Sequence, residues 1–395
     1  MFSEKMTSLG SNRSVIREIA EYGWKRATEI GRENVFDFSI GNPNVPAPEI
    51  VKETIIELLN STDSMTLHGY SSAPGMLCVR KTIAESINRR FGTNLTLNNI
   101  YMTSGAASSL TISIKALTED DDEFVTFAPY FPEYTTFVES AGAKLKVLPP
   151  DTVNFQIDLD ILEKSLTPQT KGIIINSPNN PSGVVYSEET IKSFCVLVAK
   201  KEKEFGHPIF IISDEPYREL VYGNVKVPYL MNYHKNVIVC YSYSKSLSLP
   251  GERIGYIATS PEAEQSQTLF AAICGAGRAL GYVCAPTLFQ QVVEKCVEAT
   301  ADISIYERNR EILYNGLLEM GYEGPKPDGA FYLFVKSLEE DANAFCEKAK
   351  KYELLLVPGD GFGCPGYVRI AYCVTTKQIE KSLPAFAKLA KEYKK

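Results

Sequence analysis

Short apolar runs alternate with amphipathic stretches along most of the first 280 residues of this 395-residue chain. The apolar runs, many of them rich in β-branched residues, predict strands at residues 123–128, 144–148, 172–176, 208–213, 236–241 and 254–258. The amphipathic stretches predict helices at residues 14–31, 105–117, 131–141, 187–205 and 261–275. Strands and helices that alternate in this way form a mainly parallel sheet covered by helices, so the pattern indicates an α/β fold.

The pattern changes after residue 280, where it predicts a smaller α+β unit. The expected elements are a long helix through 286–319, an apolar run at 331–335, a helix at 339–351, strands near 354–357 and 367–372, and a closing helix. A chain of this length also exceeds what one hydrophobic core usually holds. We therefore expect a large domain at 51–280 and a small domain at 281–395, which the N-terminal segment 1–50 joins.

Charge and cysteine usage narrow the class of protein. A net charge of -7 argues against nucleic acid or an anionic membrane as the main partner, and no apolar stretch approaches the ~20 residues of a membrane span. Nine scattered cysteines without a CxxC pair fit thiols in a reducing compartment, and three histidines offer little for metal chemistry. With no export signal visible, we expect a cytoplasmic protein without a metal site.

Polar motifs follow three of the predicted strands. They are Asn-Ser-Pro-Asn-Asn-Pro-Ser-Gly at 176–183, Ser-Asp-Glu-Pro-Tyr at 213–217 and Tyr-Ser-Tyr-Ser-Lys at 241–245. A fourth motif, Ser-Gly-Ala-Ala at 104–107, opens a predicted helix whose free backbone amides suit a phosphate. Each motif alone also occurs in ordinary turns, caps or close packing. Because ligands bind beyond the carboxyl ends of strands in open parallel sheets, the four together predict one binding site.

Lys245 is the most informative residue of these motifs. It stands just after a predicted buried strand, with the hydroxyls of Ser242 and Ser244 before it and Arg253 after it. A lysine in this setting suits an amine that forms an imine, and its neighbours suit a phosphate. Pyridoxal phosphate is the cofactor that needs both. Taken alone, the segment could also be a surface turn with a solvated lysine and arginine.

The combination of motifs resembles the class I/II aminotransferases among the fold-type-I pyridoxal phosphate enzymes. The resemblance extends over nearly the whole chain, and its most specific part is SxSKxxxxPGxRxGY at 242–256, supported by NNPSG at 179–183 and DEPY at 214–217. It implies a large domain with a mainly parallel, seven-stranded sheet and a smaller α+β domain. It also implies transfer of an amino group from an L-amino acid to a 2-oxo acid by a ping-pong aldimine/ketimine mechanism.

The resemblance assigns catalytic roles to Lys245, Asp214 and Tyr217 and a cofactor contact to Asn180. Lys245 would form the imine with the cofactor and then move the proton between the substrate α-carbon and C4′. Asp214 would face the pyridine nitrogen and keep it protonated, so that the ring withdraws electrons. Asn180 and Tyr217 would donate hydrogen bonds to the cofactor's phenolic oxygen and so lower the pKa of the imine.

The family pattern also implies residues that hold the cofactor. Ser242, Arg253 and the amides of Gly105, Ala106 and Ala107 would bind the phosphate. Relatives often have Ser, Thr or Lys in that small-residue loop, whereas Ala106 and Ala107 offer only backbone here. The ring that stacks on the cofactor matches Phe131, with the adjacent Tyr130 as the alternative.

Substrate and partner contacts follow from the same resemblance. Arg369, with Gly41 and Asn180, would bind the substrate α-carboxylate, since a guanidinium orients as well as attracts a carboxylate. Tyr70 matches the tyrosine that reaches the neighbouring subunit's phosphate site, which implies a homodimer. Arg278 is a candidate for binding a distal carboxylate, although a structural salt bridge would explain it equally well.

Substrate choice and reaction type leave alternatives. Aspartate with 2-oxoglutarate is weakly favoured, because that pair is frequent in the family, while the many Tyr and Phe residues could line an aromatic or aliphatic pocket. A C–S β-lyase or another carbanion enzyme on the same scaffold would share the first steps. A pyridoxal-phosphate-binding regulator or a catalytically silent protein fits less well, given the short N-terminus, the acidic charge and the intact Lys245 and Asp214.

Overall fold

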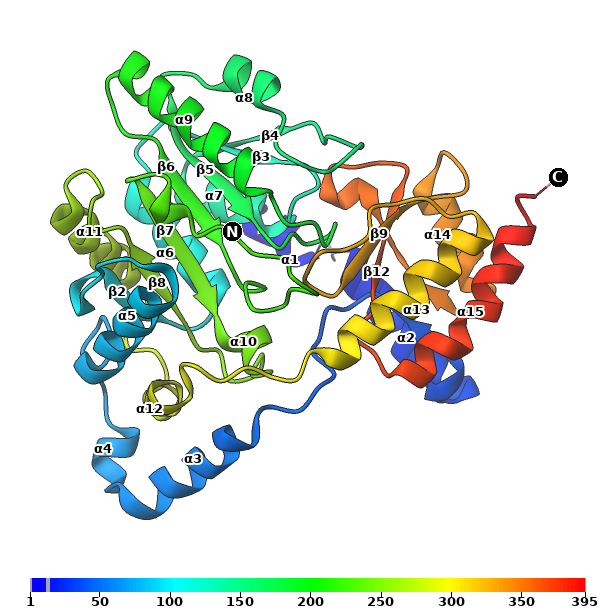
Figure 1. Ribbon diagram of the computed structural model, residues 1–395, viewed down its shortest axis with the longest axis horizontal. Coiled ribbons are helices and arrows are strands. Elements are labelled where there is room, and N and C mark those ends of the chain that lie inside the picture. Colours follow the sequence, from blue (N-terminus) through cyan, green and yellow to red (C-terminus); the bar gives the residue numbers. More distant parts are fainter. Residues whose placement is uncertain (1, 12–14, 395) are drawn as a thin grey trace.

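The computed structural model describes residues 2–11 and 15–394. Its largest sheet has seven strands (Figure 1). From one edge to the other they are β2 (Ile100–Thr103), β8 (Gly255–Thr259), β7 (Val237–Ser242), β6 (Phe210–Asp214), β5 (Thr170–Asn176), β3 (Glu123–Phe127) and β4 (Lys144–Leu148). Pairing is parallel from β7 to β4, whereas β8 is antiparallel to both neighbours. The predicted α/β class with a mainly parallel sheet is confirmed.

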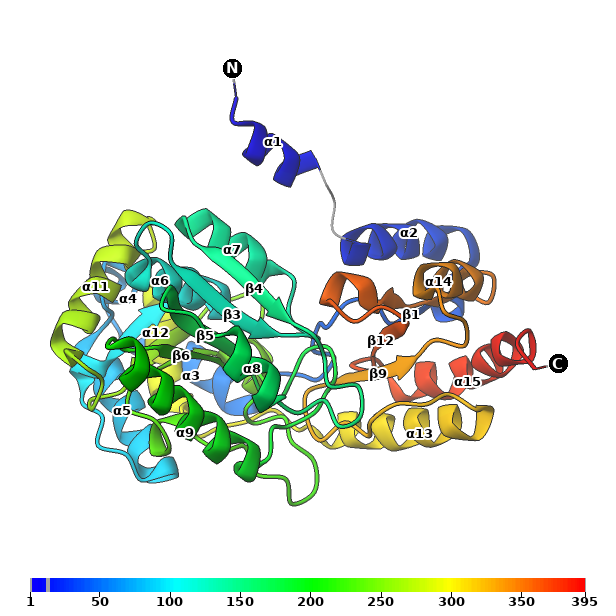
Figure 2. The ribbon, with the colours of Figure 1, turned by 90° about the horizontal axis from the view of Figure 1, so that it is seen from above.

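Helices cover both faces of this sheet (Figures 1 and 2). One face carries α6 (Ala106–Leu117), α7 (Glu133–Ala141) and α11 (Ser266–Ala279), and the other carries α5 (Leu77–Phe91), α8 (Leu159–Ser165), α9 (Glu188–Phe205) and α12 (Thr287–Cys296). The central strands are apolar on both sides. In β5, Ile173 and Ile175 join the core under one layer, and Ile174 joins the core under the other. Consecutive isoleucines are explained by this double burial, because successive side chains of a strand point to opposite faces.

A second group of elements surrounds a three-stranded antiparallel sheet. Its strands are β11 (Val357–Pro358), β12 (Tyr367–Ala371) and β9 (Tyr332–Lys336), and its helices are α13 (Ser304–Met320), α14 (Ala342–Lys350) and α15 (Thr376–Lys391). The short strand β1 (Phe36–Asp37) pairs in parallel with β10 (Leu354–Leu355). The chain segment before the large sheet therefore packs against the C-terminal part, with α2 (Val15–Ile30) beside it (Figure 2).

The remaining helices are short or lie at the edges of these layers. They are α1 (Glu4–Ser11), α3 (Glu49–Ser61), α4 (Ser64–His68) and α10 (Tyr243–Ser246). The predicted helix 14–31 corresponds to α2, and its residue 14 lies outside the described residues. No helix within residues 2–11 or 15–394 has both the length and the apolar character needed to cross a membrane.

The sequence prediction was wrong for the single long helix at 286–319. The structure has two helices there, α12 and α13, separated by residues 297–303. The backbone N–H of Ala301 donates to the carbonyl of Ser246 at 2.6 Å, which ties the connection to the segment that follows β7. The carboxylate of Asp302 accepts from the amide of Ser304, the first residue of the second helix, at 2.9 Å.

Two other differences concern short strands. Strand β2 was not predicted, because its four residues directly precede the small-residue motif and pair only with β8 at the sheet edge. The predicted strand at 354–357 is divided between two sheets: β10 pairs with β1, and β11 pairs with β12. Apolar periodicity cannot show where one of these two short strands ends and the next begins, since residues 354–357 are all buried.

Candidate active site

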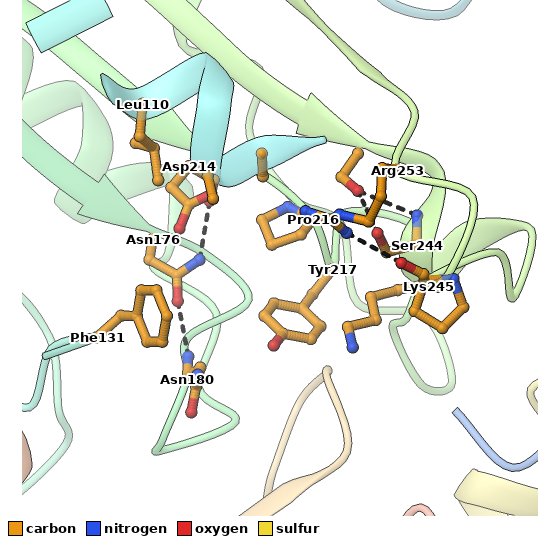
Figure 3. Close-up of a pocket in the computed structure, with 14 residues that line it drawn as sticks. Leu110, Phe131, Asn176, Asn180, Asp214, Pro216, Tyr217, Ser244, Lys245 and Arg253 are labelled. Atoms are coloured by element: carbon orange, nitrogen blue, oxygen red, sulfur yellow. Dashed lines mark hydrogen bonds between the residues drawn. The ribbon is translucent and has the colours of Figure 1, made fainter. Parts of the chain in front are cut away.

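A cavity of about 200 Å³ lies where β5, β6 and β7 end (Figure 3). Nine of the residues predicted from the sequence line it: Ala106, Ala107, Phe131, Asn180, Asp214, Tyr217, Ser242, Lys245 and Arg253. Leu110, Asn176, Pro216, Ser244 and Pro250 complete the lining. The structure thus brings the four polar motifs to one edge of the sheet, as expected for parallel strands.

Asp214 is the last residue of β6 and is buried. Its Oδ2 accepts a hydrogen bond of 2.5 Å from the hydroxyl of Tyr134 on α7, while its Oδ1 has no hydrogen-bond partner among the described residues. Burial raises the pKa of Asp214 to about 7, and the hydrogen bond from Tyr134 opposes that rise. A buried carboxylate oxygen without a partner is costly, so this position suits a cationic or N–H donor ligand.

Asn176 connects Asp214 to the neighbouring loop. Its Nδ2 donates to the backbone carbonyl of Asp214 at 2.9 Å, and its Oδ1 accepts from the backbone N–H of Asn180 at 2.7 Å. Figure 3 shows Asn176 between these two residues, with Phe131 beside them and Lys245 on the other side of the cavity. The side chain therefore fixes the loop that carries Asn180 relative to the end of β6.

Lys245 enters the cavity from the short helix α10, which follows β7 directly. Its Nζ donates to the carbonyl of Gly41 at 2.7 Å and lies 5.2 Å from the ring centre of Phe331. Burial lowers the pKa of Lys245 to about 8, and the charges of Arg253 and Arg369 act in the same direction. An amine with this pKa is neutral in roughly a tenth of the molecules at pH 7, far more than an ordinary lysine, and can act as a nucleophile and a base.

One end of the cavity is built for an anion. The hydroxyls of Ser242 and Ser244 lie 2.6 Å apart, and the guanidinium of Arg253 lines the same end. A Cβ on Gly105 would lie 2.9 Å from Nη2 of Arg253, and Gly105 has φ +92, so only glycine fits before α6. The amides of the first turn of α6 have no side-chain cap and are free to bind an anion.

The structure distinguishes the two aromatic candidates. Phe131 lines the cavity, whereas Tyr130 does not. The hydroxyl of Tyr130 lies 3.1 Å from that of Thr135, and its backbone N–H donates to the carbonyl of Phe362. Phe131 packs edge to face on Tyr134, with ring centres 5.6 Å apart.

Arg369 on β12 adjoins the cavity from the other group of elements. Its Nη1 donates to Oδ1 of Asn180 at 3.0 Å and its Nη2 to the carbonyl of Ser39 at 2.5 Å. Its Nε is buried without a partner among the described residues, and burial lowers the pKa of its guanidinium. Among the described residues this buried guanidinium bonds only neutral groups, a setting that suits a carboxylate ligand.

Arg369 also contacts Tyr332, which lies close to Gly41. The guanidinium carbon lies 4.8 Å from the ring centre of Tyr332, and a Cβ on Gly41 would lie 1.9 Å from the Tyr332 hydroxyl. Because the family resemblance predicts that Gly41 and Arg369 bind the substrate, we call Ser39, Gly41, Tyr332 and Arg369 the substrate half of the site. We call Gly105, Phe131, Asn180, Asp214, Tyr217, Ser242, Lys245 and Arg253 the cofactor half.

Besides Tyr130, the predicted residues Tyr70 and Arg278 do not line the cavity of their own chain, whereas Gly41, Gly105 and Arg369 contact residues that do. Tyr70 is 98% exposed. Arg278 stands in the last turn of α11, is exposed, and makes no salt bridge within residues 2–11 and 15–394. The structure therefore shows no salt-bridge partner that would explain Arg278 as a structural residue.

Sequence reasoning did not find Tyr134, Asn176 and Tyr332 as functional residues. Asn176 was within a quoted motif, and its place at the end of a predicted strand was a signal for it. Tyr134 and Tyr332 lie in runs of residues that are typical of a hydrophobic core. Their hydroxyls bond residues that are 80 and 115 positions away in the sequence. No local pattern reports such a contact.

Comparison with known proteins decides the family. Residues 33–386 match the family model described as aminotransferase class I and II. The chain belongs to that family. It is 31% identical to a probable aspartate aminotransferase of Methanocaldococcus jannaschii, over 94% of this chain and 95% of that protein. It is 30% identical to the aromatic-amino-acid aminotransferase 2 of Thermococcus litoralis, over 92% and 94%.

A solved structure gives a close likeness for the fold. The crystal structure of an aminotransferase from Eubacterium rectale has 59% sequence identity, covers 100% of both chains and superposes with a TM-score of 0.98. This protein is accordingly a transaminase that depends on pyridoxal phosphate, as members of the family do.

The described residues fit that cofactor. The unpartnered Oδ1 of Asp214 suits a protonated ring nitrogen, and the Lys245 amine lines the same cavity. The hydroxyls of Ser242 and Ser244, Arg253 and the amides at the start of α6 form an anion site at one end. A ring nitrogen, an aldehyde and a phosphate each find a chemically matched group.

Proposed function

We propose that this aminotransferase transfers the amino group of L-aspartate to 2-oxoglutarate, with the residues of both halves of the site in the roles given below. The observation that carries these roles is that the Lys245 amine and the buried carboxylate of Asp214 line one cavity, with Oδ1 of Asp214 unpartnered among the described residues. The choice of aspartate is supported by the name of the M. jannaschii relative. Asp214 would hold the ring nitrogen protonated. Ser242, Arg253 and the amides of Ala106 and Ala107 would hold the phosphate, and Phe131 would stack on the ring.

Lys245 carries the covalent and proton-transfer roles in this proposal. Pyridoxal phosphate, when bound, supplies an aldehyde to which Lys245 attaches and a ring that withdraws electrons from the substrate α-carbon. When the substrate amine takes the place of Lys245, the freed amine of Lys245 would carry the proton between the substrate α-carbon and C4′. The depressed pKa of Lys245, about 8, favours this because the amine can lose and regain a proton near neutral pH.

Three residues orient the reacting groups. Arg369 binds the α-carboxylate with its guanidinium. Gly41 offers only its backbone beside it, since the Tyr332 hydroxyl occupies the space that a side chain there would need. The hydrogen bond from Arg369 occupies Oδ1 of Asn180, which leaves the amide Nδ2 as a donor to the phenolic oxygen of the cofactor. Tyr217, which lines the cavity, donates to the same oxygen.

The test of the catalytic assignment is Lys245→Ala. We expect the variant to keep its circular dichroism spectrum and to lose the visible absorption band of the bound cofactor that shifts on adding an amino donor, together with turnover. Lys235→Ala is the matched control, because Lys235 lies on the surface in a 3.5 Å pair with Glu264. Unchanged turnover in Lys245→Ala would refute the assignment.

The substrate pair is tested by a panel of amino donors with pyruvate and 2-oxoglutarate as acceptors. The name of the M. jannaschii relative supports aspartate, whereas the T. litoralis relative is named for aromatic amino acids. Arg278 stays our candidate for the distal carboxylate, but it is exposed on α11 and does not line the cavity of its own chain, so this role requires the site of the second subunit. Arg278→Ala should raise KM for aspartate but not for an aromatic donor. Equal kinetics with aspartate would remove that role.

The alternative of a C–S β-lyase is not favoured by the comparisons. A lyase would release pyruvate and ammonia from cysteine-like substrates without any oxo acid. We expect product formation to require the oxo acid, which a coupled assay with and without 2-oxoglutarate measures.

We further propose a cytoplasmic homodimer in which Tyr70 reaches the second subunit's phosphate site. The 98% exposure of Tyr70 and its separation from the cavity of its own chain support this. We also propose domain limits near residues 50 and 280. Sedimentation equilibrium, followed by mixing Tyr70→Phe with Lys245→Ala protein to recover activity in mixed dimers, tests the shared site.

A further inference from the structure

Tyr332 contacts three groups that belong to different parts of the site. Its hydroxyl lies 3.0 Å from that of Tyr217, its ring faces the guanidinium of Arg369, and its hydroxyl fills the space at Gly41. The side chain is buried at the start of β9, in the sheet that also carries Arg369. In the antiparallel pairing of β9 with β12, Tyr332 lies opposite Ala371 and Phe334 lies opposite Arg369. Tyr332 is therefore held rigidly between the substrate half and Tyr217.

The hydroxyls of Tyr217 and Tyr332 share one hydrogen bond, although each hydroxyl carries a proton that it can donate. Among the described residues, Tyr217 and Tyr332 are each other's only hydroxyl partner, and both rings are buried. A hydroxyl has one proton to donate, so one of the two protons stays uncommitted. Tyr217 lines the cavity and Tyr332 does not, so an acceptor in the cavity takes the proton of Tyr217. Tyr332 then has to be the donor in the pair.

The ring of Tyr332 has a separate role from its hydroxyl. The guanidinium of Arg369 lies 4.8 Å from the centre of this ring and 4.9 Å from that of Phe362. Aromatic faces on a buried guanidinium stabilise its charge and fix its plane. The plane of Arg369 decides how it meets a carboxylate, because two parallel hydrogen bonds require a defined orientation.

We infer that Tyr332 is a positioning residue with two separable functions: its hydroxyl donates to Tyr217 and so directs the Tyr217 proton at the cofactor's phenolic oxygen, and its ring holds Arg369 in the plane that binds the substrate carboxylate. This inference rests on the roles proposed above for Tyr217 and Arg369. It adds a residue that touches neither reacting atom and acts through both of those side chains.

Tyr332→Phe tests the hydroxyl, because it removes one oxygen and leaves the ring. The readout is the pH midpoint at which the visible absorption of the bound cofactor changes, measured without substrate. Donation by Tyr217 to the phenolic oxygen lowers this midpoint, so a poorly directed Tyr217 should raise it. We expect Tyr332→Phe to raise the midpoint by roughly 0.3 to 1 pH unit, the equivalent of one hydrogen bond, with KM for the amino donor within about twofold of wild type.

Tyr332→Leu tests the ring. This variant should raise the midpoint as Tyr332→Phe does and should also raise KM for the amino donor several-fold, because Arg369 loses one aromatic face. Tyr322→Phe is the matched control for loss of a buried hydroxyl, since Tyr322 donates to the carbonyl of Phe386 far from the site. It should leave both the midpoint and KM at wild-type values.

The double variant Tyr217→Phe/Tyr332→Phe separates this inference from the proposed function. If Tyr332 acts through Tyr217, the double variant has the midpoint of Tyr217→Phe alone. An unchanged midpoint in Tyr332→Phe, a full additive shift in the double variant, or a raised KM without a shift would each overturn the inference. An unchanged midpoint in Tyr217→Phe would instead show that the role proposed for Tyr217 is wrong, and the inference would fail with it.

Discussion

The cofactor half and the substrate half of this site are built in different ways. In the cofactor half, Asp214 and Ser242 are the last residues of adjacent parallel strands, and Lys245 follows three residues later. In the substrate half, Arg369 donates to the carbonyl of Ser39, which is 330 positions away in the sequence. The cofactor half is therefore encoded by short motifs, and the substrate half by contacts between distant segments.

Three hydrogen bonds join the two halves. Lys245 donates to the carbonyl of Gly41, Arg369 donates to Asn180, and the hydroxyls of Tyr217 and Tyr332 are paired. If the division is functional, substitutions in the cofactor half should lower kcat and alter the cofactor spectrum. Substitutions in the substrate half should raise KM and leave the spectrum unchanged, except at the Tyr332 hydroxyl, which acts on Tyr217.

Asp214→Asn should have the largest effect. The amide has the same shape but no charge, so it cannot hold a proton on the ring nitrogen, and electron withdrawal by the ring weakens. We expect kcat to fall by at least about 100-fold, a typical loss for one preorganised electrostatic group, with KM little changed. Steady-state kinetics with a saturating acceptor measure this. A kcat within threefold of wild type would remove Asp214 from the mechanism.

Arg369→Lys should have the next largest effect, and mainly on KM. Lysine keeps the charge but loses the planar pair of donors, so kcat/KM should fall by roughly 10- to 100-fold. Arg310→Lys is the matched control, because Arg310 is also buried and bonds the carbonyl of Pro327 away from the cavity. A change in the cofactor spectrum of Arg369→Lys would show that the two halves are not separable.

The same division explains what the sequence could predict. Lys245, Asp214 and the small residues at 105–107 were found because polar motifs at predicted strand ends and helix starts are local signals. Arg369 and Gly41 were named only through the family resemblance, because nothing near either residue in the sequence indicates a carboxylate site. Tyr332 lies in a run of buried aromatic and aliphatic residues, and such a run is typical of core.

The fold shows the same limit. The alternating strands and helices were predicted closely because each central strand is apolar on both faces. The break between α12 and α13 depends on a bond from Ala301 to Ser246, 55 positions earlier, which periodicity does not record. Residues that depend on tertiary contacts were missed in both the fold and the site.

Tyr134→Phe should have a smaller effect within the cofactor half. Its hydroxyl is the donor to Oδ2 of Asp214, and that hydrogen bond opposes the rise in the pKa of Asp214. Without it the carboxylate takes the proton of the ring nitrogen more readily, and we expect kcat to fall by roughly three- to tenfold. Tyr130→Phe is the control, because its hydroxyl bonds Thr135 and the residue lies outside the cavity lining.

The smallest expected effect is the pH dependence that Asp214 gives to stability without cofactor. Its folded pKa, about 7, lies above the ordinary value of 3.8, so between these values the folded cofactor-free protein binds more protons than the unfolded chain. The stability that protonated Asp214 contributes is present below pH 3.8 and is lost as the pH rises towards 7. A positively charged ring nitrogen lowers the pKa of Asp214 and removes this loss.

The stabilisation by cofactor should therefore increase between pH 5 and 7 and then level off. Differential scanning calorimetry of the protein with and without cofactor measures it as a difference in Tm, and we expect that difference to grow by about 1 to 3 °C over this range. Asp214→Asn cannot titrate, so its Tm difference should lack this increase, while other titrating groups contribute equally to both proteins. If wild type and Asp214→Asn showed the same increase in the Tm difference, the Asp214 carboxylate would have to stay ionised in the cofactor-free protein, and its burial at the end of β6 would not raise its pKa as described.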